Sequence, residues 1–173
     1  MSSRLPEYID PLRLAEARAV LQGQFAIAGM RRLASALHST QGVVDVDIEF
    51  GIDEARTPYV KGVLRAGLEV VCQRCLGPMV LPVEVEVALG IVTSAQEADR
   101  LPGNYDPLLV EEEPISLKDV VEDELILSLP VAPVHLEQQC PPWRDTVVEQ
   151  PAEKTGKPSP FAVLAQLKDK KQH

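Results

Sequence analysis

The chain has 173 residues, of which 45% are apolar and 25% are charged. This composition excludes a wholly disordered, collagen-like or disulfide-scaffold protein, and the length fits one domain of roughly 150 residues with a tail. The net charge of −9 argues against a nonspecific nucleic-acid binder, which gains its affinity from cations that neutralise phosphates. Most of the acidity falls in residues 97–149, with thirteen acidic residues against three basic ones, whereas residues 1–40 and 150–173 are mildly basic.

Targeting and redox features point to a cytoplasmic protein. No run approaches the roughly 20 apolar residues of a membrane-spanning helix, so we expect no membrane contact. The first ten residues lack the basic and then apolar pattern of a signal peptide. In a reducing compartment, the three cysteines are expected to be free thiols or metal ligands and not disulfides.

The first forty residues predict little regular structure. Residues 8–13 contain Pro11 and are expected to be extended, and residues 21–25 are expected to form a short strand. A helix is predicted over about 28–38, because apolar residues recur at helical spacing at Ile27, Met30, Leu33, Ala34 and Leu37. Arg31 and Arg32 lie on its opposite side, where they serve either as a solvated face or as a contact for nucleic-acid phosphates.

Three successive runs predict a β-meander. Residues 44–53 alternate strictly between apolar and polar side chains, which is typical of a half-buried strand. Residues 59–72 alternate less cleanly, and residues 79–89 place valines and leucines on one face and glutamates on the other. Short connections between the three runs favour an antiparallel sheet with one solvated face.

After a predicted loop at 92–107 and a short edge strand at 108–110, the best-marked helix begins. Ser116 is a suitable N-cap, Asp119 lies in the first turn near the positive end of the helix dipole, and Pro130 ends the helix. Strands and helices are segregated along the chain. The predicted fold is therefore α+β, an antiparallel meander with two helices packed on it.

One side of this helix is acidic. Asp119, Glu122, Asp123 and Glu124 place like charges three and four residues apart, which destabilises an isolated helix by a few tenths of a kcal/mol per pair. A basic partner protein or a cation would favour such a face, and a solvated surface is the alternative. Asp119, Glu122 and Asp123 are therefore candidate partner-binding residues.

The C-terminal part differs from the rest of the chain. Residues 1–140 are expected to form one domain, followed by a flexible linker at 141–158, which is rich in Pro, Glu, Thr and Lys. Residues 159–173 predict a short C-terminal helix with a basic tail, begun by Ser159 and Pro160 and carrying Phe161 and Leu164. Such a helix either docks on a partner or packs on its own domain.

The cysteines suggest a metal site. Cys72 and Cys75 occur as C-x-x-C between two predicted strands, and His135 and Cys140 have a spacing that completes a tetrahedral two-plus-two set for structural Zn²⁺. Unligated thiols are the alternative, and a redox pair is a third interpretation. Arg74, between the first two cysteines, is either a solvated turn residue or a contact for a thiolate or a phosphate.

Catalytic motifs such as G-x-S-x-G, a phosphate-binding glycine loop or H-E-x-x-H do not occur in the sequence. Three segments together resemble the bacterial YceD family. They are residues 72–75, residues 120–135 with Cys140, and residues 160–168, and the resemblance extends to Ile9-Asp10-Pro11. Some members carry a second C-x-x-C after the helix, whereas the corresponding stretch here, residues 140–143, has only its first cysteine.

The resemblance implies a non-enzymatic factor for accumulation of 23S rRNA, through its synthesis, processing or stability. Because the chain is acidic, we expect it to act through ribosomal proteins or an rRNA-processing factor, with the basic ends as the alternative route to rRNA itself. A different class of function is a thiol oxidoreductase or metal-dependent enzyme that uses Cys72 and Cys75.

Overall fold

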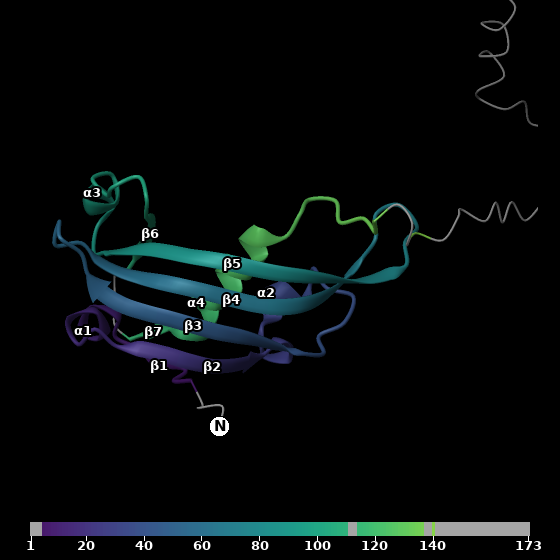
Figure 1. Cartoon of the computed structure of the whole chain (residues 1–173), viewed down its shortest axis with the longest axis horizontal. Helices are drawn as coiled ribbons and strands as arrows, with labels where there is room; N and C mark the ends of the chain where they lie inside the picture. Colours follow the sequence, from purple (N-terminus) through teal and green to yellow (C-terminus); the bar gives the residue numbers. More distant parts are fainter. Residues whose placement is uncertain (1–4, 111–113, 137–139, 141–173) are drawn as a thin grey trace, which may run out of the picture. The chain divides into compact units, whose positions relative to one another are not determined.

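The computed structural model describes residues 5–110, 114–136 and 140. A five-stranded sheet in the order β2-β3-β4-β5-β6 forms its centre (Figure 1). Its strands are β2 (Val20–Ala26), β3 (Val43–Ile52), β4 (Pro58–Val71), β5 (Pro78–Val92) and β6 (Asp106–Leu109). A separate pair joins β1 (Tyr8–Ile9) to β7 (Ile115–Ser116), and the helical elements are α1 (Pro11–Glu16), η1 (Ile27–Gly29), α2 (Arg31–Ala34), α3 (Ala95–Ala98) and α4 (Leu117–Ser128).

The predicted meander is confirmed. The strands β2, β3, β4 and β5 pair antiparallel in sequence order. β3 buries every second side chain from Val44 to Phe50, as its alternating sequence predicts. β4 and β5 pair from Tyr59↔Gly90 to Val71↔Pro78, whereas β3 pairs with β4 only as far as Ala66. The β4–β5 hairpin therefore extends past β3 as a two-stranded arm.

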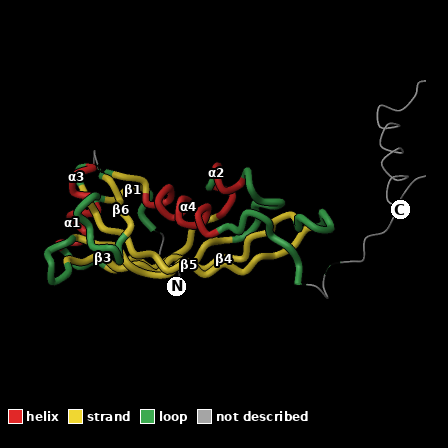
Figure 2. Tube along the Cα trace, turned by 90° about the horizontal axis from the view of Figure 1, so that it is seen from above, coloured by secondary structure: helices red, strands yellow, loops and turns green. Residues whose placement is uncertain are grey.

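The helix predicted to begin after Ser116 is confirmed as α4. The Ser116 hydroxyl accepts a hydrogen bond from the Asp119 N–H at 3.2 Å, which caps the helix. Leu117, Val121 and Leu125 are buried on the side that joins the sheet's hydrophobic core. Figure 2 shows α4 and α2 on the same side of the sheet.

The expectation that residues 8–13 are extended is only partly right. Tyr8 and Ile9 form β1, but α1 begins at Pro11. Asp10 caps this helix through a 2.8 Å bond from the Arg13 N–H, and proline is favourable at a first helical position, where no N–H partner is required. The proline therefore begins a helix here and does not prevent one.

The helix predicted over 28–38 is wrong in length. The segment is split into η1 and the four-residue α2, separated by Met30 in an extended conformation. The chain leaves the helix because the His38 N–H donates to the Glu69 carbonyl at 2.7 Å and Ser39 bridges to Glu69 in β4. The predicted apolar face is still the buried one, since Ile27, Met30 and Leu33 are fully buried.

The region predicted as a loop at 92–107 contains the short helix α3, and the predicted edge strand begins earlier, at Asp106. This strand, β6, pairs parallel to β5, so the sheet is antiparallel only as far as β5. Ser94 caps α3 through a bond from the Glu97 N–H. Between β5 and β6 the chain reverses direction twice, through α3 and the loop that follows it. β6 therefore runs in the same direction as β5.

Gly62 is required by a close approach between β4 and β3. Its φ is +156°, and a Cβ at this position would lie 2.1 Å from the Asp47 carbonyl oxygen. We expect Gly62→Ala to lower the free energy of unfolding by about 2 kcal/mol, because the strands must separate or the backbone must strain. Urea unfolding measures the effect. Gly103→Ala is the control, since a Cβ there meets nothing within 4 Å.

No helix among the described residues is long and apolar enough to cross a membrane. The predicted linker at 141–158 and the predicted C-terminal helix at 159–173, with Phe161 and Leu164, lie outside the described residues.

Candidate metal centre

The first half of the candidate site is the tip of the β4–β5 arm. β4 ends at Val71, and Cys72 begins a tight turn in which its N–H donates to the Gly77 carbonyl and its carbonyl accepts from the Leu76 N–H, both at 2.9 Å. Cys72 is fully buried, and Cys75 is partly buried. The turn therefore fixes two thiols three residues apart, which the C-x-x-C spacing predicts.

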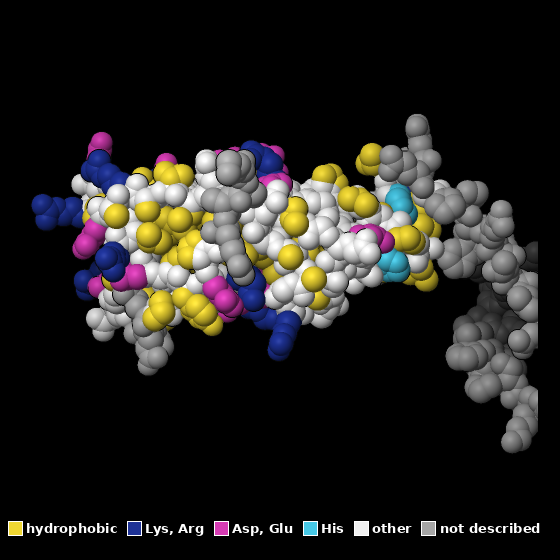
Figure 3. Space-filling view, turned by 90° about the horizontal axis from the view of Figure 1, so that it is seen from below, with side chains coloured by type: hydrophobic (Ala, Val, Ile, Leu, Met, Phe, Trp, Pro, Cys, Tyr) yellow, Lys and Arg dark blue, Asp and Glu magenta, His cyan; other side chains and the backbone are white. Residues whose placement is uncertain are grey.

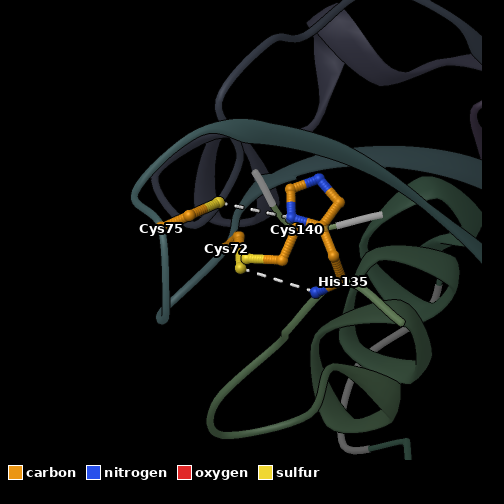
Figure 4. Close-up of side chains that lie close together, drawn as sticks. All are labelled: Cys72, Cys75, His135 and Cys140. Atoms are coloured by element: carbon orange, nitrogen blue, oxygen red, sulfur yellow. Dashed lines mark hydrogen bonds between the residues drawn. The ribbon is translucent and has the colours of Figure 1, made fainter. Parts of the chain in front are cut away.

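The second half is the segment that follows α4. The Gln73 N–H donates to the Pro133 carbonyl at 2.8 Å, and the Arg74 guanidinium donates to the His135 carbonyl at 3.3 Å. These bonds bring His135 to the hairpin tip, although about 60 residues of sequence separate the two segments. Figure 4 shows the two cysteines of the turn beside His135 and Cys140.

The four side chains form one cluster. The ligand atoms of Cys72, Cys75, His135 and Cys140 all lie within 4.8 Å of one another, and Cys75 Sγ is 3.4 Å from His135 Nδ1. Sulfur atoms of a tetrahedral zinc site with Zn–S bonds of about 2.3 Å lie about 3.8 Å apart. The cluster could therefore hold a metal ion with small side-chain movements. The residues are the four that the sequence spacing predicts.

Backbone donors surround the Cys72 sulfur. Burial raises the pKa of this thiol, but N–H groups of Cys75, His135 and Arg74 favour the thiolate and together lower the pKa to about 5. The N–H groups of Arg74 and His135 each lie 3.4 Å from Cys72 Sγ. A buried thiolate that is held by backbone donors is the form that binds a metal ion.

The pKa of Cys75 is shifted in the opposite direction, above its ordinary value. The N–H of Gly77 lowers its pKa, but burial and the neighbouring thiols of Cys140 and Cys72 raise the pKa by more. Crowding several thiolates without a cation is unfavourable, because like charges at short distance repel. Ionising all three sulfurs of the cluster is therefore unfavourable without a cation. A dication bound among them would relieve the repulsion.

The Cys72 pKa makes the stability of the metal-free protein depend on pH. The pKa of a cysteine thiol in the unfolded chain is about 8.5, whereas the pKa of Cys72 in the folded chain is lowered to about 5. The stabilising contribution is complete above the unfolded pKa and is lost as the pH falls through about 5. We expect the metal-free parent to have a higher urea midpoint than metal-free Cys72→Ser, and this difference to grow as the pH rises from about 5 to about 8.5. An unchanged difference would contradict the expectation.

The acidic side of α4 differs from the sequence-based expectation at Glu122. This residue is only 3% exposed, and its carboxylate accepts hydrogen bonds from the N–H groups of Arg32 and Leu33, at 2.6 and 2.9 Å. These donors belong to the first turn of α2, which has no side-chain cap of its own. Glu122 is thus a structural cap and cannot present its carboxylate to a partner.

Some of the charged residues next to Glu122 form ion pairs and hydrogen bonds with one another. The Arg32 guanidinium forms an ion pair with Asp123, lies 3.5 Å from a Glu122 carboxylate oxygen, and donates to the Asp119 carbonyl at 3.3 Å. The Asp123 side chain raises the pKa of Arg32 through this hydrogen bond. Asp119, Asp123 and Arg31 are exposed. Arg32 is therefore part of the contact between α2 and α4. Arg74 lies elsewhere, at the tip of the β4–β5 hairpin beside His135.

The sequence does not reveal the backbone groups that complete the site. Nothing in the pattern of residues 72–75 indicates that the His135 N–H points to the Cys72 sulfur. The carbonyls of Pro133 and His135, which join the two halves, also have no side-chain signature. Pro130 and Pro133 are a sequence feature that bears on this contact, because they keep the segment before His135 extended.

The fold and the cluster define a small α+β protein whose sheet carries a cluster of three cysteines and one histidine at the end of a hairpin arm. Residues 60–168 match the family model for large ribosomal RNA subunit accumulation protein YceD. A protein of that name from Haemophilus influenzae is 35% identical over 96% of this chain and 98% of its own length. No solved structure matches the chain. The chain belongs to the YceD family.

Proposed function

We propose that this protein is a non-enzymatic factor in ribosome biogenesis that is needed for accumulation of 23S rRNA. The observation that carries the proposal is the near full-length relationship to a protein named for large ribosomal RNA subunit accumulation. The name does not specify synthesis, processing or stability, and the proposal includes all three routes.

We further propose that the cluster binds one structural Zn²⁺. Three thiolates and one imidazole are a donor set typical of structural zinc sites, in which protein ligands fill all four positions and leave none for substrate. The metal would join the tip of the β4–β5 arm to the segment after α4. This role suits a binding scaffold better than an enzyme.

Burial of Cys72 also bears on the alternative thiol chemistry. A catalytic thiol must be reached by its substrate, and the Cys72 side chain has no exposed surface. Its low pKa therefore supports a ligand more than a nucleophile. Thiol oxidoreductase activity with Cys72 and Cys75 would require substrate access at Cys75, which alkylation of the metal-loaded protein measures.

We propose that the partners are ribosomal proteins or an rRNA-processing factor, and that the segment with Phe161 and Leu164 contributes to their binding. Its apolar residues at helical spacing support a docking peptide. Protein contacts are favoured over rRNA contacts because the chain carries a net charge of −9.

A deletion strain tests the function. We expect the ratio of 23S to 16S rRNA to fall in the strain and to be restored by the parent gene. Phe161→Ala is expected to restore the ratio only partly and to weaken recovery of partners by the tagged protein. A deletion strain with an unaltered ratio would overturn the proposal.

A further inference from the structure

One face of the sheet is largely uncovered in the described part of the chain, although Leu101 and Tyr105 pack over its end at Gly90. The helices α2 and α4 lie on the other side (Figure 2), where the core residues of β3, β4 and β5 point. Side chains that alternate with the core residues face outward and form what we call the open face. It comprises Asp45, Asp47, Glu49, Lys61, Val63, Arg65, Gly67, Glu69, Val80, Pro82, Glu84 and Glu86.

The open face is acidic, and its few cations are already engaged. Six carboxylates accompany two cations, Lys61 and Arg65. The Arg65 Nε donates to Glu84 at 3.1 Å, and the Lys61 amino group lies over the rings of Tyr59 and Tyr105, at 4.7 and 4.9 Å from their centroids. Asp45 and Asp47 accept hydrogen bonds from the side-chain amides of Gln24 and Gln22, at 2.6 and 2.9 Å. Because an amide is neutral, these bonds leave the negative charge of both carboxylates available to attract a cation from outside.

The central row of the open face has a distinctive arrangement. Val63 in β4 pairs with Asp47 on one side and Glu86 on the other, so an apolar side chain lies between two carboxylates. Adjacent strands are about 4.8 Å apart, which places the carboxylates roughly 10 Å apart across the sheet. A lysine or arginine can lay its aliphatic stem over the valine and offer its charged end to a carboxylate.

A hollow lies beside this row. It has a volume of about 340 Å³ and is lined by Val43, Ala66, Gly67, Pro82 and Val83, with Asp45, Arg65 and Glu84 at its rim. Gly67 leaves space there because it has no side chain. Apolar lining with charged residues around it matches a segment that carries both apolar and charged side chains.

We propose that the open face docks a lysine- or arginine-rich segment of a partner protein, with its cations on Asp47 and Glu86 and an apolar residue in the hollow. This rests on the proposed function, in which the chain acts through protein partners. Charge complementarity selects the occupant, because phosphates of RNA would be repelled by the same carboxylates.

The test uses the full-length protein, purified without chelators, and a fluorescent peptide of alternating lysine and valine. The double variant Asp47→Asn/Glu86→Gln removes two charges without changing side-chain shape. We expect it to bind the peptide about tenfold more weakly, since each lost charge contact contributes a factor of a few. The matched control Glu16→Gln/Glu54→Gln removes two exposed carboxylates off the open face and is expected to bind as the parent does.

Three binding results would overturn the proposal. They are equal losses in the test and control variants, a loss that appears instead in Asp119→Asn/Asp123→Asn on α4, and a preference for a polyuridine RNA over the peptide. The level of 23S rRNA in the deletion strain is measured separately. If the parent restores 23S rRNA and the open-face variant restores it equally well, the docking proposal fails while the proposed function stands.

Discussion

Replacing Cys72 with serine is expected to remove bound zinc and to release the tip of the β4–β5 arm. We expect the purified parent to contain about one zinc per chain, as in a closed tetrahedral site, and the affinity of Cys72→Ser for zinc to fall by more than about 100-fold. Loss of residues that merely support ligands already costs about 10–100-fold. Elemental analysis of protein purified without chelators measures the metal.

The same substitution is expected to destabilise the fold. Structural zinc contributes about 10–16 kcal/mol in zinc-finger peptides, which have almost no core without it. Here the sheet and α4 have their own core, so we expect a smaller loss of about 4 kcal/mol, with hydrogen exchange accelerated first in residues 72–77 and 130–136. A chelator should reproduce the effect in the parent protein.

His135→Ala provides the second ligand variant, and His38→Ala is its matched control. His38 is also near the arm and contacts Glu69 at 3.8 Å, but it lies outside the cluster. We expect zinc to be lost in His135→Ala and retained in His38→Ala. Figure 3 shows hydrophobic and acidic side chains beside the histidines at this end of the molecule. A chelator-treated parent as stable as the untreated parent would contradict the structural role.

Glu122→Ala is expected to lower the free energy of unfolding by about 3 kcal/mol. The substitution leaves the N–H groups of Arg32 and Leu33 without their acceptor and removes the carboxylate beside the Arg32 guanidinium. Hydrogen bonds to charged groups contribute about 1.5–3 kcal/mol each, and removal of one partner of a buried pair costs about 3–5 kcal/mol. Urea unfolding measures the change.

Two further variants separate the cap from the charge. Glu122→Gln keeps an acceptor oxygen for the α2 donors, and we expect it to lose about half as much stability. Asp123→Ala removes the exposed partner of Arg32, and a loss below about 1 kcal/mol is expected because exposed ion pairs contribute little. Equal losses in Glu122→Ala and Asp123→Ala would show that Glu122 acts only as a surface charge.

The sequence by itself determined the elements whose signals are local. Alternation over β3 predicted a half-buried strand because successive side chains point to opposite faces. Ser116 and Pro130 bounded α4 through capping and the missing proline N–H. The spacing of Cys72, Cys75, His135 and Cys140 predicted the four side chains that cluster, since the preference for a metal ligand is carried by side-chain type.

The tertiary structure decided the features that depend on distant backbone groups. Glu122 has the same local pattern as its acidic neighbours, and its burial follows only from donors in α2, about 90 residues away. The helix predicted over 28–38 ends early because β4 offers His38 a better hydrogen bond than the helix does. The open face likewise becomes one surface only when β3, β4 and β5 pair, because pairing register, and not sequence distance, places Asp47, Val63 and Glu86 in one row.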